Sequence, residues 1–361
     1  MILSNKGLNL KIFGESHSEY IGLKLSGIDS GIKIDFDKLQ SYVNRRKSVK
    51  ANYSTTRIES DKLIVKGGFD RDTTNGQCIE IVIKNENIRS HDYENLQAIP
   101  RPSHADYPYY VKTGGKACIG GGKFSGRMTL PLVIGGGIAV QILESYNISL
   151  YAHILEIGGI KSFSFSKDNI TIDSLSKIKD DAIPVLSCEA KESILDAIAK
   201  ASSSANSLGG IVEVVAFGVP VGIGDALFDG FESCASAILF GIPAVKGVEF
   251  GAGFDISRMP GDKANDCYQI LDGKIVTKTN NCGGIVGGMT NGMPIIVRAA
   301  FKPTPSIGMI QNSVDLKTMK EVTLKIEGRH DTCFLPRAVV AVEAAIALSI
   351  LDTMKCSSIK E

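Results

Sequence analysis

Short polar motifs recur along the chain, and each sets a cation or an imidazole beside small residues. They read GESHS at 14–18, RRK at 45–47, RPSHAD at 101–106, GGGKFSGR at 120–127, FKPTPS at 301–306 and GRHD at 328–331. Guanidinium, ammonium and backbone N–H groups hold phosphate oxygens, and an imidazole exchanges a proton near neutral pH. Brought together by a fold, such motifs predict a site for an anionic, phosphate-bearing ligand where a proton moves.

The stretch IPRPSHADY at 99–107 places one of only five histidines beside an arginine. A purely structural interpretation is a turn that the prolines stiffen, with Ser103 and Asp106 bonded to the backbone. The functional interpretation is that Arg101 contacts an anion and His104 handles a proton. This segment alone leaves both interpretations open.

Familiar nucleotide and metal motifs do not fit the glycine-rich segments. A phosphate-binding P-loop over GGGKFSGR fails because Ala117 and Phe124 occupy two of its required positions. A dinucleotide fingerprint starting at Gly120 fails at Ser125. The eight cysteines form no Cys-x-x-Cys pair, so no zinc or other metal site is predicted. The 38 glycines instead indicate tight turns, close packing or loops that approach an anion.

Composition excludes several classes of partner. Lys and Arg total 40 against 39 Asp and Glu, a net charge of +1. We therefore expect no nucleic-acid or membrane-surface partner. The longest apolar stretch, at 130–143, contains a proline and is predicted to be too short to span a bilayer. With no apolar leader at the start and scattered cysteines, a cytoplasmic protein with reduced thiols is the expectation.

Both strand and helix patterns are abundant, without regular alternation. Strands are predicted within 8–15, 22–28, 61–70, 77–85, 151–160, 210–221, 244–254 and 292–303, and helices within 36–47, 127–146, 191–205, 227–241 and 336–355. Neighbouring strands favour antiparallel pairing, hence an α+β fold. Helices that are apolar nearly all round need cover on several sides. We predict a layer of long helices between two antiparallel sheets, with a possible internal duplication and no linker dividing residues 1–361.

The ordered motifs resemble those of the chorismate synthase family over nearly the whole chain. The matching segments are FGESH, RPSHADY, GGGKFSGR, AVKGVEFGAGF at 244–254, GGIVGGMTNGMPII at 283–296 with KPTPSI at 302–307, and GRHD. The resemblance implies one catalytic domain over 1–361, a cytoplasmic homotetramer and a carbon–oxygen lyase. Its reaction is the 1,4-elimination of phosphate from 5-enolpyruvylshikimate 3-phosphate to give chorismate, the last common step toward aromatic amino acids. The family requires reduced FMN.

Catalytic roles follow from the resemblance, residue by residue. His17 matches the histidine near the substrate phosphate and would act as an acid toward the leaving group. His104 matches the histidine linked to the protonation state of the flavin. Asp331 matches the carboxylate that helps flavin N5 act as a base. His330, His91 and His153 are expected to be structural.

Binding residues are carried over in the same way. The substrate would be held by Arg46, Arg101, Arg127 and Arg337. The flavin would be held by Lys123, Phe124, Ser125, Ala244, Gly287, Lys302, Pro303, Thr304, Pro305, Ser306 and Arg329. Arginine suits the first task because its planar fork binds two oxygens at once.

The sequence departs from the family pattern at several positions. They are Ser18, Ser48, Val49, Asn52, Lys123, Phe124, Pro243 and Ala252, and Asn52 stands where an arginine is expected. Two other functions therefore stay open. One is a binding protein that keeps the pocket without catalysis, and the other is a flavin oxidoreductase that consumes NADPH. No reductase segment is recognisable, so we expect an external source of reduced FMN, such as a flavin reductase.

Overall fold

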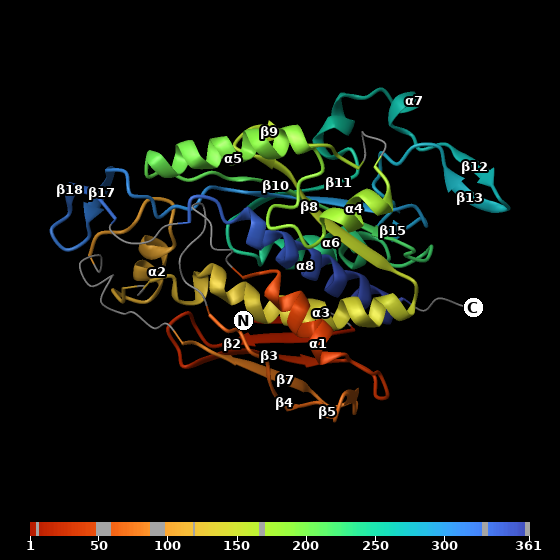
Figure 1. Ribbon diagram of the computed structural model, residues 1–361, viewed down its shortest axis with the longest axis horizontal. Coiled ribbons are helices and arrows are strands. Elements are labelled where there is room, and N and C mark those ends of the chain that lie inside the picture. Colours follow the sequence, from red (N-terminus) through yellow and green to blue (C-terminus); the bar gives the residue numbers. More distant parts are fainter. Residues whose placement is uncertain are drawn as a thin grey trace.

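The structure is a computed structural model that describes residues 1–4, 7–47, 59–86, 98–117, 120–165, 170–326 and 331–357. Within them, two five-stranded antiparallel sheets dominate, which confirms the α+β class (Figure 1). The first sheet has the order β1 (Ile2–Ser4), β2 (Asn9–Phe13), β3 (Tyr20–Ser26), β7 (Ile79–Lys84), β4 (Ile64–Gly67). The second has the order β11 (Val245–Phe250), β16 (Ile295–Phe301), β10 (Gly210–Phe217), β8 (Ser149–Ile157), β9 (Ile160–Lys161).

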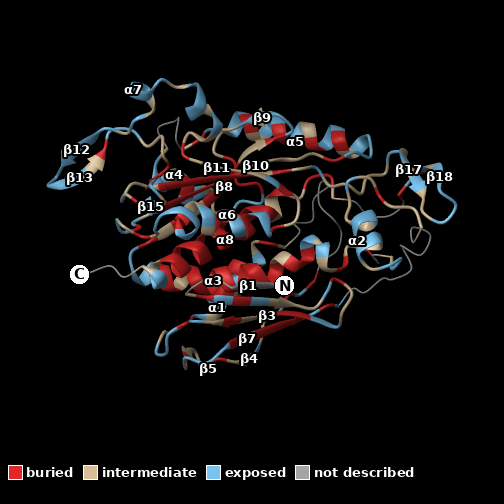
Figure 2. Cartoon of the chain, turned by 180° about the vertical axis from the view of Figure 1, so that it is seen from behind, coloured by how far each residue is buried: buried red, intermediate tan, exposed pale blue. Residues whose placement is uncertain are grey.

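Helices fill the space between the two sheets (Figure 1). They are α1 (Phe36–Asn44), α3 (Thr129–Ser145), α6 (Phe231–Phe240) and α8 (Leu335–Cys356). Helix α3 contacts the first sheet and α8, and α8 contacts β8 and β10 of the second sheet. Figure 2 shows α3 and α8 as the most continuously buried helices. One apolar cluster runs through this layer and into both sheets.

The glycine triplet in α3 explains how closely the central helices pack. A Cβ atom added to Gly136 would lie 2.4 Å from the Cα of Ala344 in α8. Only glycine permits that approach, so close helix packing, one of the three uses expected of the glycines, is found here. With its preceding 3-10 turn the helix runs over 20 residues, Gly126–Ser145, long enough to cross a membrane. The prediction that this segment is too short was wrong, but 78% of its most apolar window is buried inside the fold.

The remaining elements cover the outside and the ends. They are α2 (Asp106–Lys112), α4 (Ile172–Ile178), α5 (Cys188–Ser203), α7 (Gly261–Ala264) and the hairpins β5–β6 (Phe69–Asp70, Thr73–Thr74), β12–β13 (Tyr268–Leu271, Lys274–Thr277), β14–β15 (Ile285–Val286, Met289–Thr290) and β17–β18 (Gln311–Asp315, Lys320–Leu324). Helix α5 lies on the outer side of the second sheet, and α2 and β15 mark opposite ends of the molecule (Figures 1 and 2).

The major predicted helices and strands are found, with shifted ends. The clearest local signal was the start of α1, where the Asp35 carboxylate accepts a hydrogen bond of 2.9 Å from the backbone N–H of Lys38. Helices α2 and α4 and the three outer hairpins after residue 260 were not predicted, because they are short and carry little apolar periodicity. The internal duplication stays a prediction.

Candidate functional site

The loop of residues 120–128 is the element around which the predicted site residues gather. It contains two 3-10 turns, Gly122–Phe124 and Gly126–Met128, and Gly120 begins it with a φ of 60°. A Cβ atom on Gly120 would lie 2.4 Å from Cε1 of His17. The carbonyl of Gly120 accepts a hydrogen bond from Nη2 of Arg101. Glycine at this position therefore lets two motifs distant in sequence meet at one backbone group.

His17 follows β2 in a turn held by hydroxyl groups. Oγ of Ser16 lies 2.9 Å from Nδ1 of His17 and orients the ring. The hydroxyl of Ser18, one of the departures from the family pattern, donates to the carbonyls of Glu15 at 2.8 Å and Tyr20 at 2.7 Å. Serine at position 18 thus closes the turn that presents His17.

The RPSHAD motif folds into a compact charged cluster at the start of α2. Asp106 accepts from Nε of Arg101 at 2.7 Å, from its Nη2 at 2.8 Å and from its backbone N–H at 3.0 Å. Nδ1 of His104 lies 2.6 Å from the same carboxylate. Burial alone would raise the pKa of Asp106, but the bonds from Arg101 and His104 outweigh it and hold that pKa well below its usual range. The turn of the structural interpretation is therefore present, and it holds Arg101 and His104 against one carboxylate. Their roles toward an anion and a proton stay a prediction.

The segment after β16 reaches the same cluster from the second sheet. The backbone N–H of Lys302 donates 3.0 Å to the carbonyl of Ala244, and its ammonium donates to the carbonyl of Ser103. Burial, with Lys246 nearby, lowers the pKa of Lys302. Nη1 of Arg101 lies 3.4 Å from Oγ of Ser306. The KPTPS segment 302–306 thus lies directly against the RPSHAD motif.

A basic and aromatic group lies on the outer side of the glycine-rich loop. The Lys123 ammonium lies 5.2 Å from the ring centre of Tyr109 and 5.4 Å from that of Phe124. The two rings meet edge to face, with centroids 5.7 Å apart. The ammonium of Lys123 thus lies against two aromatic rings. There it can also bind an anionic group of a ligand.

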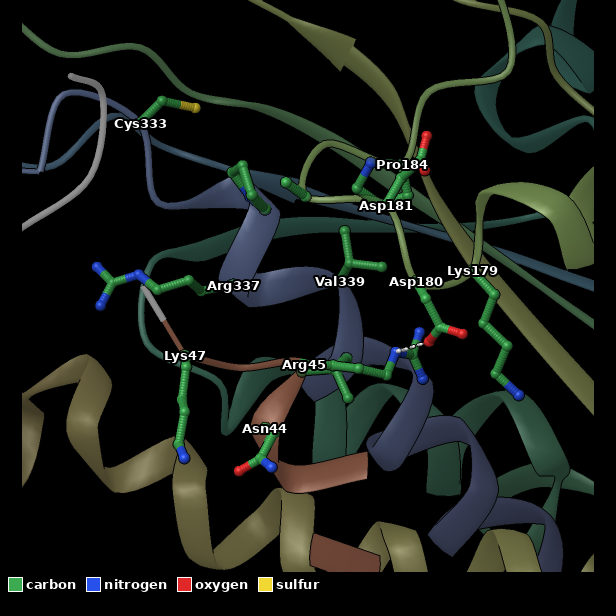
Figure 3. A pocket seen from close by; sticks show the side chains of 13 residues that line it. Asn44, Arg45, Lys47, Lys179, Asp180, Asp181, Pro184, Cys333, Arg337 and Val339 are labelled. Carbon is green, nitrogen blue, oxygen red and sulfur yellow. Dashed lines mark ion pairs between the residues drawn. The ribbon is translucent and has the colours of Figure 1, made fainter. Parts of the chain in front are cut away.

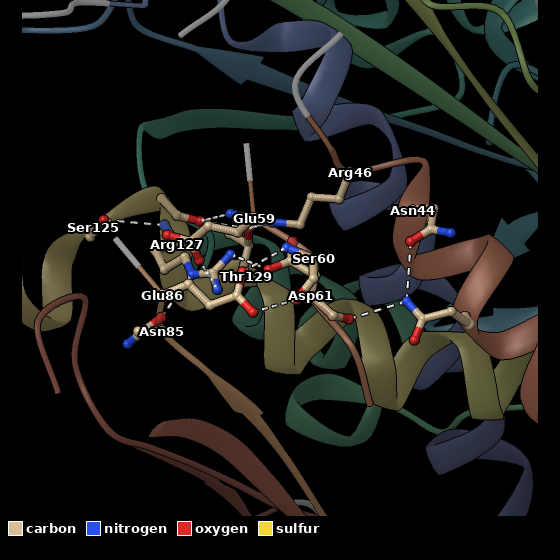
Figure 4. A network of polar contacts seen from close by, with 12 residues as sticks. Asn44, Arg46, Glu59, Ser60, Asp61, Asn85, Glu86, Ser125, Arg127 and Thr129 are labelled. Atoms are coloured by element: carbon tan, nitrogen blue, oxygen red, sulfur yellow. Dashed lines mark hydrogen bonds and ion pairs between the residues drawn. The ribbon is translucent and has the colours of Figure 1, made fainter. Parts of the chain in front are cut away.

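A second group of cations lies at the other end of the same loop. Nε of Arg46 donates 2.8 Å to Oγ1 of Thr129, and its Nη2 donates 2.7 Å to the carbonyl of Gly126 (Figure 4). Burial, together with the charges of Arg337 and Arg127, lowers the pKa of Arg46 to about 9. Repulsion among clustered cations is relieved when an anion binds, so this arrangement favours a phosphate or a carboxylate.

Arg337 connects this group to Asp331 and to a cavity. The Arg337 guanidinium donates to the Asp331 carboxylate. A cavity of about 220 Å³ lies beside Arg337, between the end of α1 and the start of α8 (Figure 3). Arg45, Lys47 and Lys179 also line it. Burial raises the pKa of Cys333 in its wall to about 12, so that thiol stays protonated and unreactive.

Arg127 has protein partners that the sequence did not reveal. Its guanidinium donates 2.6 Å to Asp61 and 3.1 Å to Asn85, and pairs with the Glu59 carboxylate (Figure 4). The side chain is largely buried. Arg127 therefore ties the segment before β4 to the loop of residues 120–128, in addition to any contact with a ligand.

Gly287 is not brought together with the other flavin candidates. It lies in the turn between β14 and β15, eight residues before β16 begins, whereas Lys302 follows the end of β16. The two ends of β16 are separated by seven residues of extended strand, roughly 23 Å at 3.3 Å per residue. Figures 1 and 2 place β15 at the end of the molecule away from α2. Within one chain, Gly287 does not share the cluster of Arg101 and His104.

Several predicted positions lie outside the described residues. They are Arg329 and His330 of the GRHD motif, His91, and Ser48, Val49 and Asn52 among the departures. His153 is fully buried and pairs with Glu213 at 3.0 Å, as expected for a structural residue.

Asp106 is the residue whose importance the sequence reasoning missed. Its position two residues after His104 was the available signal, but it was interpreted only as a turn former.

Comparisons with known proteins agree with one another. A family model described as chorismate synthase matches residues 8–355. The chorismate synthase of Thermococcus kodakarensis is 40% identical over 351 residues, 97% of this chain and 96% of that protein. That of Pyrococcus abyssi is 42% identical over 346 residues, 96% and 95% of the two chains. A solved structure described as a crystal structure of chorismate synthase aligns with a TM-score of 0.75 at 24% identity, over 97% of this chain and 92% of its own.

Proposed function

Because the chain belongs to the chorismate synthase family, we infer that it is the lyase that converts 5-enolpyruvylshikimate 3-phosphate into chorismate. The C–O bond to phosphate breaks, a ring proton leaves, and a second ring double bond forms without net oxidation or reduction. The observation in the structure that supports this best is the meeting of His17 and Arg101 at Gly120, with His104 beside them. This meeting supports His17 as the acid and Arg101 as a cation for the leaving phosphate.

We propose reduced FMN as the cofactor, and the described residues fit an anionic flavin nucleotide. Lys123 and Lys302 supply ammonium groups, and Oγ1 of Thr304 is buried with no hydrogen-bond partner within the described part of the chain. A buried hydroxyl of that kind is ready for a ligand oxygen. Lys123, Phe124, Ser125, Ala244 and residues 302–306 would hold the cofactor, whereas Gly287 of the same chain does not fit. When bound, reduced FMN supplies an electron to the substrate and recovers it as the proton leaves.

The protein residues then divide the remaining tasks. His17, oriented by Ser16, gives a proton to the departing phosphate. Arg46, Arg101 and Arg337 bind the anionic groups of the substrate. Burial and the charges of Arg337 and Arg127 lower the pKa of Arg46, and a trianionic substrate would offset that positive charge. Asp331 is held by Arg337 and assists proton removal. Closure of such a site around its ligands excludes water and oxygen.

An anaerobic assay tests the proposed function. The purified chain, dithionite-reduced FMN and the enolpyruvyl phosphate substrate are expected to yield chorismate and phosphate in equal amounts. Running the assay with NADPH and oxidised FMN in place of dithionite separates two kinds of enzyme. We expect turnover only with the reduced flavin, since an external flavin reductase is proposed. Phosphate release without chorismate, or NADPH consumption without substrate, would contradict the proposal.

A binding protein without catalysis is the second candidate, and the partners of Arg127 favour it. A cation expected to hold substrate is already bound by Asp61 and Glu59. Calorimetry that shows FMN binding, in a preparation that forms no chorismate, would select this alternative. Chorismate formation by the same preparation would exclude it.

We also propose that residues 1–361 form one catalytic domain in a cytoplasmic homotetramer. The continuous apolar core that joins both sheets supports a single domain. Hairpin β12–β13 supports self-association because Ile270 and Ile275 are 79% and 72% exposed at the end opposite α2. Apolar surface of this kind is usually covered in an assembly. Light scattering of the purified chain is expected to give four times its mass of 38.6 kDa.

A further inference from the structure

We propose that Asp106 is a positioning residue that fixes the proton of His104 on Nδ1, so that Nε2 is the ring nitrogen presented to the ligands. This inference deepens the proposed function and rests on it for the role of His104. The starting observation is the 2.6 Å separation between Nδ1 of His104 and Oδ1 of Asp106. At that distance one of the two atoms must carry a hydrogen.

The carboxylate cannot be the donor. Oδ2 of Asp106 accepts from Nε and from the backbone N–H of Arg101, and Oδ1 accepts from Nη2 of Arg101. Three bonds from a guanidinium and an amide keep the carboxyl ionised, as its depressed pKa also indicates. An ionised carboxylate only accepts, so the hydrogen lies on Nδ1 of His104.

The charged neighbours of His104 agree with this assignment. Nη2 of Arg101 lies 3.2 Å from Nδ1, but a guanidinium only donates, so it cannot bond to a protonated Nδ1 and bonds instead to Asp106 and the Gly120 carbonyl. Lys302 approaches from the second sheet and binds the Ser103 carbonyl rather than the ring. Asp106 thus decides the tautomer of His104 while it also directs Arg101 toward Gly120.

Replacing Asp106 by asparagine makes a sharp prediction. The amide oxygen would stay with Nε and the backbone N–H of Arg101, which leaves the amide NH₂ facing His104. That group donates, so the proton of His104 would move to Nε2. A general acid–base group in the wrong tautomer loses its function, and such groups contribute about 10²–10⁴ in rate. Asp106→Asn should therefore lower kcat by about that factor and change KM little.

Neutron diffraction and kinetics test the proposal independently. In deuterated crystals of the unliganded chain we expect a deuteron on Nδ1 of His104, and in Asp106→Asn a deuteron on Nε2 alone. The control is Asp255→Asn, which removes a carboxylate from the exposed ion pair with Arg258 and should leave kcat unchanged. A deuteron on Nε2 alone in the wild-type chain overturns the proposal, as does Asp106→Asn with wild-type kcat. If the chain forms no chorismate, the proposed function fails, but the neutron map still decides the tautomer, even if the variant does not fold.

Discussion

Two clusters of aspartate or glutamate with histidine and arginine lie in opposite surroundings. In both, a histidine nitrogen and an arginine Nε share one carboxylate, at 2.6 and 2.7 Å in the Arg101–His104–Asp106 cluster and at 3.0 and 2.7 Å in the His153–Glu213–Arg298 cluster. The second cluster is a row across neighbouring strands β8, β10 and β16. The first is built on a turn before α2 and contacts the loop of residues 120–128 and the segment 302–306.

Exposure and partners separate the two clusters. The side chains of His153 and Glu213 are 0% exposed, whereas those of His104 and Asp106 are 13% and 12% exposed. Glu213 also binds the hydroxyl of Ser164 and the backbone N–H of Phe165 at 2.9 and 2.7 Å, so it fastens a loop to the sheet. A carboxylate, an imidazole and a guanidinium thus form a fully buried cluster in the sheet and a partly exposed one before α2, and we propose ligand chemistry only for the exposed cluster.

Replacing each histidine by alanine gives the largest expected contrast. His104→Ala should reduce chorismate formation by about 10²–10⁴, because a proton-handling group is lost, with little change in melting temperature. His153→Ala should leave turnover per folded molecule nearly unchanged, while lowering the melting temperature because a buried hydrogen-bonded network is broken. Anaerobic turnover and thermal unfolding measure the two effects. Equal losses of turnover in both variants would contradict the assignment of a functional role to His104 and a structural role to His153.

Removing the shared carboxylate from the sealed cluster should cost stability. Glu213→Ala leaves Arg298 and His153 buried without their acceptor, and breaking a buried ion pair costs about 3–5 kcal/mol. Urea unfolding, followed by circular dichroism, measures the loss. The matched exposed variant, Asp255→Ala, removes a carboxylate from the Arg258 pair at the surface and should change stability by less than about 1 kcal/mol. A loss for Glu213→Ala no larger than that would contradict the account.

Low pH should reduce the contribution of Glu213 to the stability of the fold. Burial would raise the pKa of Glu213, but hydrogen bonding to His153 and the charges of His153 and Arg298 lower it to about 2, from an ordinary value of 4.5. A carboxyl with a lowered pKa stabilises the fold above its ordinary pKa and loses that contribution as pH falls. The stability difference between the wild-type chain and Glu213→Gln should therefore shrink from pH 4.5 down to pH 2. A constant difference over that range would show that the carboxylate is not held ionised.

The smallest effect on ligand binding is expected where Ser306 contacts Arg101 of the exposed cluster. Nη1 of Arg101 and Oγ of Ser306 are 3.4 Å apart, a long contact for a hydrogen bond. Ser306→Ala should raise the KM for substrate or the Kd for FMN by no more than about fivefold, equivalent to about 1 kcal/mol. Steady-state kinetics and flavin titration measure these constants. A larger loss would mean that Ser306 contributes more to ligand binding than this long contact indicates.

Most of this fold, but only part of the site, could be predicted from the sequence. Long apolar runs predicted α3 and α8, and the glycines indicated close packing, because both signals are local. The approach of Gly120 to His17 depends on the pairing of segments about a hundred residues apart, which no local pattern encodes. The partners of Arg127, Glu59 and Asp61, and the distance of Gly287 from Lys302, were hidden for the same reason.

A crystal structure with reduced FMN and the enolpyruvyl phosphate substrate tests the central claim most directly. We expect both ligands in one pocket beside the loop of residues 120–128, with His17 near the phosphate, His104 presenting Nε2 to the flavin and Asp331 on the same ligands. Ligands bound away from that loop, or His17, His104 and Asp331 contacting no common pocket, would contradict the account.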